Sequence, residues 1–173
     1  MNMTTLNALL RDAKHSSWKR FVLNRVLWAG IPFNAPHRLR IEQIDDHEVR
    51  ISIPFIKRNL NHLRSLHACV MATAAEYASG LMLLQHFEAT RYRLIMQKIE
   101  VEYHYQGKKA GYSVAQLTAD QVQRDVLSRF AAGDDRVVFQ AQAAVYDIDN
   151  QHLCTATIYW QIKDWKAVRT ATV

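Results

Sequence analysis

A single acidic side chain, Glu76, stands inside a long apolar stretch of the sequence. Its immediate neighbours are small or aromatic: Ala74, Ala75, Tyr77 and Ala78. Burying a carboxylate without a partner is costly, and the usual result is a raised pKa. A carboxylate with a raised pKa is suited to act as a general base. The alternative is that Glu76 faces a water-filled cleft or a subunit interface and pairs there with an arginine or lysine.

The other residue types that perform chemistry form weaker patterns. His62 and His67 have no cysteine or carboxylate pattern beside them, so the histidines do not indicate a metal site. His67 is a candidate either for contacting a substrate or for capping the local backbone, whereas His62 and His104 are expected on the surface. The sequence contains no phosphate-binding glycine loop and no Ser-His-Asp motif.

The element that must position Glu76 is a helix, which we expect from about Ser65 to Phe87. Ala and Leu favour this conformation, and Ser65 is the expected N-cap. The helix is apolar on all sides, and such a helix is normally buried in a protein core. It is long enough to cross a membrane, but Glu76 and the strand-like segments on both sides argue against that interpretation.

The segments around this helix predict the rest of the fold. Residues 4–29 have helical periodicity, as one bent helix or two short ones, and Pro32 and Pro36 follow them. Residues 120–129 predict a short turn or helix. Alternation with period two predicts six strands, at about residues 38–43, 49–53, 95–105, 112–118, 139–145 and 153–162. Strands segregated from helices indicate an α+β fold with an antiparallel sheet wrapping the apolar helix.

Composition narrows the class of protein. The chain has 173 residues and 49% hydrophobic residues, which suits one domain with a substantial core. Two cysteines in apolar segments, Cys69 and Cys154, indicate reduced thiols and, with no signal-peptide pattern, a cytoplasmic protein. A net charge of +6 favours an anionic partner or surface. The aromatic residues alternate as core residues do, which argues against a nucleic-acid partner.

The residues around His67 and the order of elements resemble the hotdog-fold thioesterases, over about residues 20–165. In that family an Asn, a Gly and a His-Gly-Gly sequence precede the central helix, and an acidic residue follows nine positions after the His. Here Asn61 lies six residues before His67, and Glu76 lies nine after it. Two departures are evident: Arg64 stands where the family usually has Gly, and Ala68-Cys69 replaces the Gly-Gly pair.

The resemblance implies a hotdog fold, in which a curved antiparallel sheet of about six strands wraps the central helix. It is nearest to an uncharacterised acyl-CoA thioesterase-like branch with a helical N-terminal extension. We therefore expect residues 1–36 to form that extension and residues 37–173 to form the hotdog domain. The family assembles as dimers or dimers of dimers, with active sites at the interface, so we expect a homo-oligomer here.

The implied activity is hydrolysis of an acyl-CoA or acyl-carrier thioester. Glu76 would be the base or nucleophile, Asn61 would orient the water or the carbonyl, and the Ala68 N–H would stabilise the oxyanion. His67 completes the candidate catalytic set. Coenzyme A would be part of the substrate, no other cofactor is implied, and the phosphate candidates are Lys108, Lys109 and Arg91. The alternative is a non-catalytic hotdog module that binds acyl-CoA or serves an assembly role, which the two departures keep open.

Overall fold

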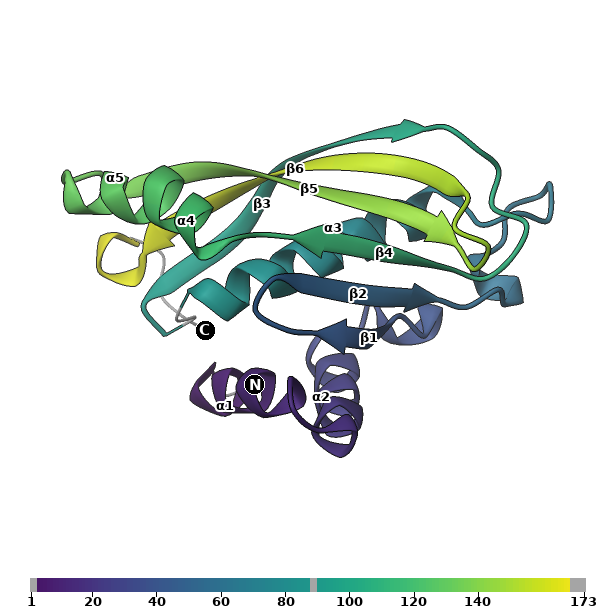
Figure 1. The fold of residues 1–173 in the computed structure, drawn as a ribbon, viewed down its shortest axis with the longest axis horizontal. Coiled ribbons are helices and arrows are strands. Elements are labelled where there is room, and N and C mark those ends of the chain that lie inside the picture. Colours follow the sequence, from purple (N-terminus) through teal and green to yellow (C-terminus); the bar gives the residue numbers. More distant parts are fainter. Residues whose placement is uncertain (1–2, 88–89, 169–173) are drawn as a thin grey trace.

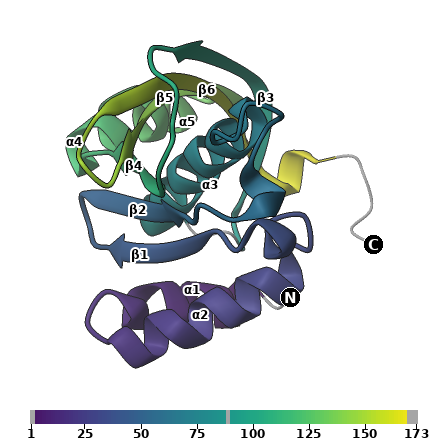
Figure 2. The ribbon, with the colours of Figure 1, turned by 90° about the vertical axis from the view of Figure 1, so that its right-hand side faces the viewer.

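The computed structural model describes residues 3–87 and 90–168. Six antiparallel strands form one sheet in the order β1-β2-β4-β5-β6-β3, and the sheet curves around the helix α3 (Figures 1 and 2). The strands are β1 (Arg40–Ile44), β2 (Glu48–Ile53), β3 (Tyr92–Tyr103), β4 (Gly111–Gln116), β5 (Arg136–Asp147) and β6 (His152–Asp164). The predicted α+β class, the wrapped helix and the number of strands are confirmed.

The central helix α3 spans Ala68–His86, so it begins three residues later than predicted. The expected N-cap, Ser65, was wrong, because its hydroxyl donates to the Asn61 side chain in the preceding loop. His67 caps the helix instead, and its Nδ1 accepts a hydrogen bond from the Cys69 N–H at 3.1 Å. At a rise of 1.5 Å per residue, α3 is about 28 Å long and crosses the whole domain.

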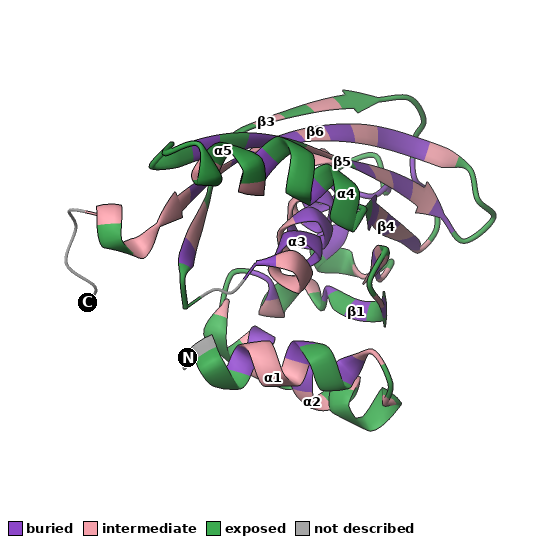
Figure 3. Ribbon diagram, turned by 60° about the vertical axis from the view of Figure 1, so that its left-hand side comes forward, coloured by how far each residue is buried: buried purple, intermediate pink, exposed green. Residues whose placement is uncertain are grey.

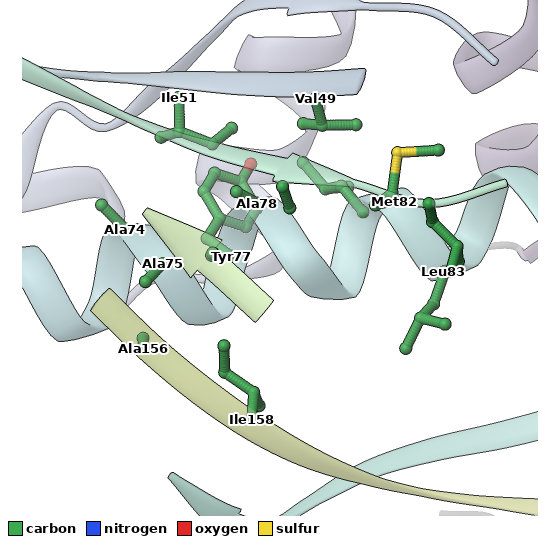
Figure 4. Close-up of a cluster of buried hydrophobic side chains, with 14 of the residues drawn as sticks. Val49, Ile51, Ala74, Ala75, Tyr77, Ala78, Met82, Leu83, Ala156 and Ile158 are labelled. Atoms are coloured by element: carbon green, nitrogen blue, oxygen red, sulfur yellow. The ribbon is translucent and has the colours of Figure 1, made fainter. Parts of the chain in front are cut away.

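One face of α3 packs into the concave side of the sheet. Figure 4 shows Ala74, Ala78 and Met82 of the helix among side chains of β2 and β6. The contacting strand residues are fully buried: Val49, Ile51, Ala156 and Ile158. Burial of each large aliphatic side chain stabilises the fold by roughly 1.5–3 kcal/mol, so this face anchors the helix in one orientation.

The N-terminal extension consists of two helices, α1 (Met3–Ala13) and α2 (Ser17–Gly30), which lie below β1 in Figure 2. Asn24 of α2 ties the extension to the sheet edge. Its Oδ1 accepts from the Ile41 N–H at 2.7 Å, and its Nδ2 donates to the Ile41 carbonyl at 3.1 Å. Leu6, Leu10 and Leu27 are buried in the same core as the sheet. The extension therefore packs on the domain. Residues 169–173, which the prediction assigned to the hotdog domain, lie outside the described residues.

The two edges of the sheet differ. Asn24 covers part of the β1 edge, whereas β3 is the outer strand on the opposite side. Figure 3 shows β3 with long exposed segments, and its large side chains Ile95 and Met96 are 45% and 40% exposed. A β-bulge near Met96 shifts the β3–β6 register, so the simple alternation predicted for this strand is interrupted.

Several connections contain short helical pieces. A helical segment of three pieces joins β4 to β5: α4 (Ala119–Val122), a π-helical turn (Gln123–Leu127) and α5 (Ser128–Ala131). Single 3-10 turns occur at Ala35–His37, Lys57–Asn59 and Trp165–Ala167. Among the described residues, no helix has the length and hydropathy needed to cross a membrane.

Candidate active site

Glu76 lies midway along α3 and faces a cavity of about 760 Å³. The wall of this cavity is almost entirely apolar, with contributions from both N-terminal helices, α3, β3 and β6. Burial raises the pKa of Glu76 to about 7. Within residues 3–87 and 90–168, no cation pairs with this carboxylate and no donor contacts it. The described part of a single chain therefore does not provide the arginine or lysine partner that was the alternative for this residue.

A second polar group, the Tyr77 phenol, lines the same cavity. Tyr77 is only 4% exposed, and its hydroxyl has no hydrogen-bond partner in the described part of the chain. Burial, together with the neighbouring Glu76 charge, raises the pKa of Tyr77, so the phenol stays protonated and remains a donor. Sequence reasoning missed this residue, although a tyrosine directly after the buried carboxylate was a usable signal.

The loop before α3 is organised by Asn61. Its Oδ1 accepts hydrogen bonds from the Leu63 N–H at 2.9 Å, from the Ser65 N–H at 3.2 Å and from the Ser65 hydroxyl. Arg64, in the same loop, has a φ of 56°, which lies in the left-handed region that glycine adopts most easily. The resemblance led us to expect Gly at this position, and a positive φ is a physical reason for that preference. Here the loop keeps that shape with an arginine.

The start of α3 offers one free backbone donor. The Ala68 N–H has no acceptor among the residues that the structure describes, while the Ala68 carbonyl accepts from the Tyr103 hydroxyl at 2.9 Å. The first N–H groups of a helix carry partial positive charge and lack intrahelical partners. His67, which is exposed, is occupied as the N-cap through its Nδ1. Ala68 thus presents a donor suited to an anionic oxygen.

The structure does not bring all of the predicted catalytic residues together in one chain. Asn61 and Ala68 line a separate, shallower depression beside Tyr103 and Gly107, and His67 lines neither concavity. Glu76 is eight residues further along α3 than Ala68, which corresponds to about 12 Å. Within one chain, the carboxylate and the helix-start donor therefore face different depressions.

The predicted phosphate-binding residues lie at opposite ends of β3. Arg91 directly precedes the strand, with its Nε 3.8 Å from an Asp164 carboxylate oxygen, and it stacks on Tyr92. Lys108 and Lys109 lie beyond the other end, and Lys109 is paired with Asp149. The 12 residues of β3 span roughly 40 Å, so these two groups cannot contact the same phosphate of one ligand within one chain.

Comparison with known proteins identifies the family. The family described as "Domain of unknown function (DUF4442)" matches residues 20–162, which is most of the chain. The chain belongs to this family. No curated protein matches it.

Solved structures with similar folds include thioesterases. PA5026 from Pseudomonas aeruginosa, a protein of unknown function described as a probable thioesterase, is 22% identical with a TM-score of 0.74. That match covers 83% of this chain and 95% of PA5026. Thioesterase HI1161 from Haemophilus influenzae is 13% identical with a TM-score of 0.66, covering 86% of this chain and 92% of the other. The predicted hotdog fold and the resemblance to thioesterases of that fold are confirmed.

Proposed function

We propose that this protein is a thioesterase that hydrolyses an acyl-CoA or acyl-carrier thioester, with Glu76 as the base or nucleophile. The observation that carries the proposal is the position of Glu76 in an apolar cavity, where this carboxylate has no counterion among residues 3–87 and 90–168 and its pKa is raised to about 7. Such a carboxylate takes up and releases a proton near neutral pH, which general-base catalysis requires. Similarity in fold to thioesterases agrees with this assignment.

Hydrolysis of the thioester follows one of two routes, with Glu76 as a general base or as a nucleophile. As a base, Glu76 takes a proton from water while the water oxygen bonds to the thioester carbon, and the C–S bond then breaks. The leaving thiolate receives the proton from Glu76, which yields a carboxylic acid and a free thiol. As a nucleophile, the Glu76 oxygen itself bonds to the thioester carbon, and the C–S bond breaks to release the thiolate. Water then cleaves the resulting anhydride, which frees the carboxylic acid, restores the Glu76 carboxylate and supplies the proton that converts the thiolate to a thiol.

The developing oxyanion needs a donor, and we assign this role to the Ala68 N–H. Asn61 would assist, because its Oδ1 is engaged in the loop while its Nδ2 makes no hydrogen bond within the described residues. His67 fixes this donor by capping the helix start. Glu76 and Ala68 face different depressions of one chain. The complete site therefore needs a second copy of the chain, whose α3 N-terminus, with its Ala68 N–H, lies at the Glu76 cavity of the first.

We infer that this second copy pairs through β3 in a twofold homodimer, on its own or within a dimer of dimers. β3 is an edge strand, and an edge with unpaired backbone groups and exposed apolar residues is a surface for pairing with another strand.

Ile95→Asp should raise the dimer dissociation constant at least tenfold in sedimentation equilibrium. Ile148→Asp, at an exposed position in the β5–β6 turn, is the matched control and should have no effect. A wild-type chain that stays monomeric at micromolar concentration would contradict the dimer and the shared site.

Coenzyme A enters as part of the substrate, and the proposal requires no other cofactor. Arg91, Lys108 and Lys109 remain candidates for its phosphates, with Lys108 the least neutralised because Lys109 is paired with Asp149. The free thiols of Cys69 and Cys154 agree with a cytoplasmic location.

The direct test is hydrolysis of saturated acyl-CoAs from acetyl to palmitoyl, measured by release of the free CoA thiol. We expect turnover with at least one chain length. A second candidate, a hotdog module that binds acyl-CoA without turnover, is favoured by one observation, the separation of Glu76 from Ala68 in a single chain. Saturable acyl-CoA binding with no thiol release at any chain length would establish this alternative and contradict the thioesterase.

A further inference from the structure

We propose that the cavity beside Glu76 is a binding site for a saturated or nearly saturated hydrocarbon chain, and that the N-terminal extension forms the wall that limits the length of this chain. The inference rests on the proposed thioesterase function and adds the class of acyl group. It assigns a substrate-selecting role to α1 and α2, two helices that the predicted catalytic set does not involve.

One wall of the cavity is a single face of α3. Cys69, Thr73, Glu76, Gly80 and Leu84 recur at intervals of three or four residues, which places them along one side of a helix. This face is about 22 Å long, and Glu76 lies near its middle. A substrate whose reacting carbon lies at Glu76 therefore has apolar surface on both sides of that carbon.

The opposite wall comes from the extension. Leu6 of α1 and Leu27 of α2 are each 2% exposed, and Ile31 and Phe33 continue the wall beyond the end of α2. None of these side chains belongs to the hotdog sheet, so the cavity exists in this form because the extension covers α3. Figure 3 shows α1 and α2 below α3 on that side of the molecule.

The two ends of the cavity differ in exposure, and this difference gives the chain a direction. Cys69 at one end is exposed, whereas Leu81 and Tyr92 toward the other end are buried. Between them Gly80 lets the Trp160 ring of β6 pack closely against α3, because a Cβ there would lie 3.0 Å from that ring. The polar part of a thioester would therefore leave near Cys69, and the hydrocarbon would extend past Gly80 toward Leu84.

The chemistry of the lining also selects the ligand. A cavity of about 760 Å³ falls within the usual range for small-molecule sites, which is roughly 300–1,000 Å³. Along the chain path beyond Glu76 the lining is aliphatic and aromatic, with the Arg93 side chain at its far end. Two lining residues, Tyr77 and Arg93, have a buried polar atom without a hydrogen-bond partner among the described residues. The rest of the path is apolar, so a hydrocarbon chain fits it, whereas a hydroxylated or charged acyl group would lose its hydration there.

The first test measures binding of saturated acyl-CoAs of increasing length to the full chain, with Trp160 and Trp165 of the cavity wall as fluorescent reporters. Each added methylene should raise affinity about fourfold until the cavity is full. Affinity that does not change with chain length would overturn the inference.

Two pairs of variants locate the hydrocarbon chain. Leu84→Trp narrows the cavity, and Gln85→Trp places the same bulk one position along α3, outside the lining. Ile31→Trp and Ala29→Trp form the matching pair on the extension. We expect Leu84→Trp and Ile31→Trp to reduce the preference for long over short chains at least tenfold, while Gln85→Trp and Ala29→Trp leave it unchanged. An equal loss in both members of a pair would assign the effect to general destabilisation and overturn the inference.

The same series separates this inference from the proposed function. Chain-length-dependent binding without thiol release would support the hydrocarbon site and contradict the thioesterase. Thiol release at equal efficiency for all chain lengths would support the thioesterase and contradict the hydrocarbon site.

Discussion

The two faces of α3 are made from similar residues but have different surroundings. On the face toward the sheet, Ala74 and Ala78 are fully buried and Met82 is 2% exposed, against side chains of β2 and β6 (Figure 4). On the face toward the cavity, Glu76 and Gly80 are only half-buried, and space remains beside them. The first face is close-packed and fixes the helix, whereas the second leaves room for a ligand around a carboxylate.

A helix that is apolar on all sides need not be in contact with protein on all sides. Packing against the sheet supplies the stability of the fold, because it removes apolar surface from water. The cavity face contributes less of this stabilisation and retains a carboxylate at an energetic cost. The two faces should therefore respond in opposite ways to substitution.

The largest expected effect is on the cavity face. Glu76→Gln keeps the side-chain shape and removes the charge, so it should lower thioester turnover about 10²–10⁴-fold, the usual effect of losing a positioned base. Thiol release under saturating acyl-CoA measures this effect. Glu42→Gln, at an exposed position on β1, is the matched control and should keep the wild-type rate. Wild-type turnover in Glu76→Gln would remove Glu76 from the mechanism.

The next effect is on stability as a function of pH. The folded pKa of Glu76, about 7, lies above its ordinary value of 4.5, so the folded state holds this proton more tightly than the unfolded state. Stability from this group is fully present below about pH 4.5 and is lost as pH rises through about 7. The loss should approach about 3 kcal/mol at most. Urea unfolding at pH 5 and pH 8 should show it in the wild type and not in Glu76→Gln; parallel curves for the two proteins would contradict a buried, uncompensated carboxylate.

A third prediction contrasts the two faces directly. Ala78→Leu adds volume against the sheet, where there is no space, and should destabilise the fold by about 1–3 kcal/mol. Ala72→Leu adds the same volume on the cavity side and should change the free energy of unfolding by no more than about 0.5 kcal/mol. Urea denaturation measures both variants. Equal destabilisation would mean that the cavity is absent in solution.

The smallest expected effect concerns the polar end of the substrate. Replacing Lys108 and Lys109 with Glu should weaken CoA binding only a few-fold, because Lys109 is already paired with Asp149 and both side chains are exposed. Calorimetric titration with CoA at two salt concentrations measures the change. Unchanged affinity would move the phosphate site to Arg91 or to another cationic part of the surface.

Much of this architecture could be predicted from the sequence. The period-two segments are the strands, because a strand with one face on α3 must alternate, and the helical periodicity of residues 4–29 corresponds to α1 and α2. Glu76 was identifiable because one charged residue in an apolar helix is costly to bury. These features follow from local pattern and from burial alone.

The remaining features depend on contacts that are distant in the sequence. The start of α3 was misplaced because Ser65 had two possible partners, and the Asn61 side chain competes with the helix for its hydroxyl. The role of the extension in closing the cavity follows from the pairing of Asn24 with the β1 backbone, 17 residues away. No periodicity in the sequence indicates that Glu76 and Ala68 face different depressions, because that separation arises only when the sheet curves around the helix.

The most direct test of the central claim is the pH dependence of kcat/KM for thioester hydrolysis, which reports the ionisation of the free enzyme. We expect kcat/KM to rise with pH as Glu76 loses its proton, with an apparent pKa of about 7 and a plateau above it. The residual activity of Glu76→Gln should lack this step. Two results would contradict the assignment of Glu76 as the catalytic carboxylate. One is a wild-type kcat/KM that does not change over about 1.5 pH units on either side of that pKa. The other is a step of the same size in Glu76→Gln.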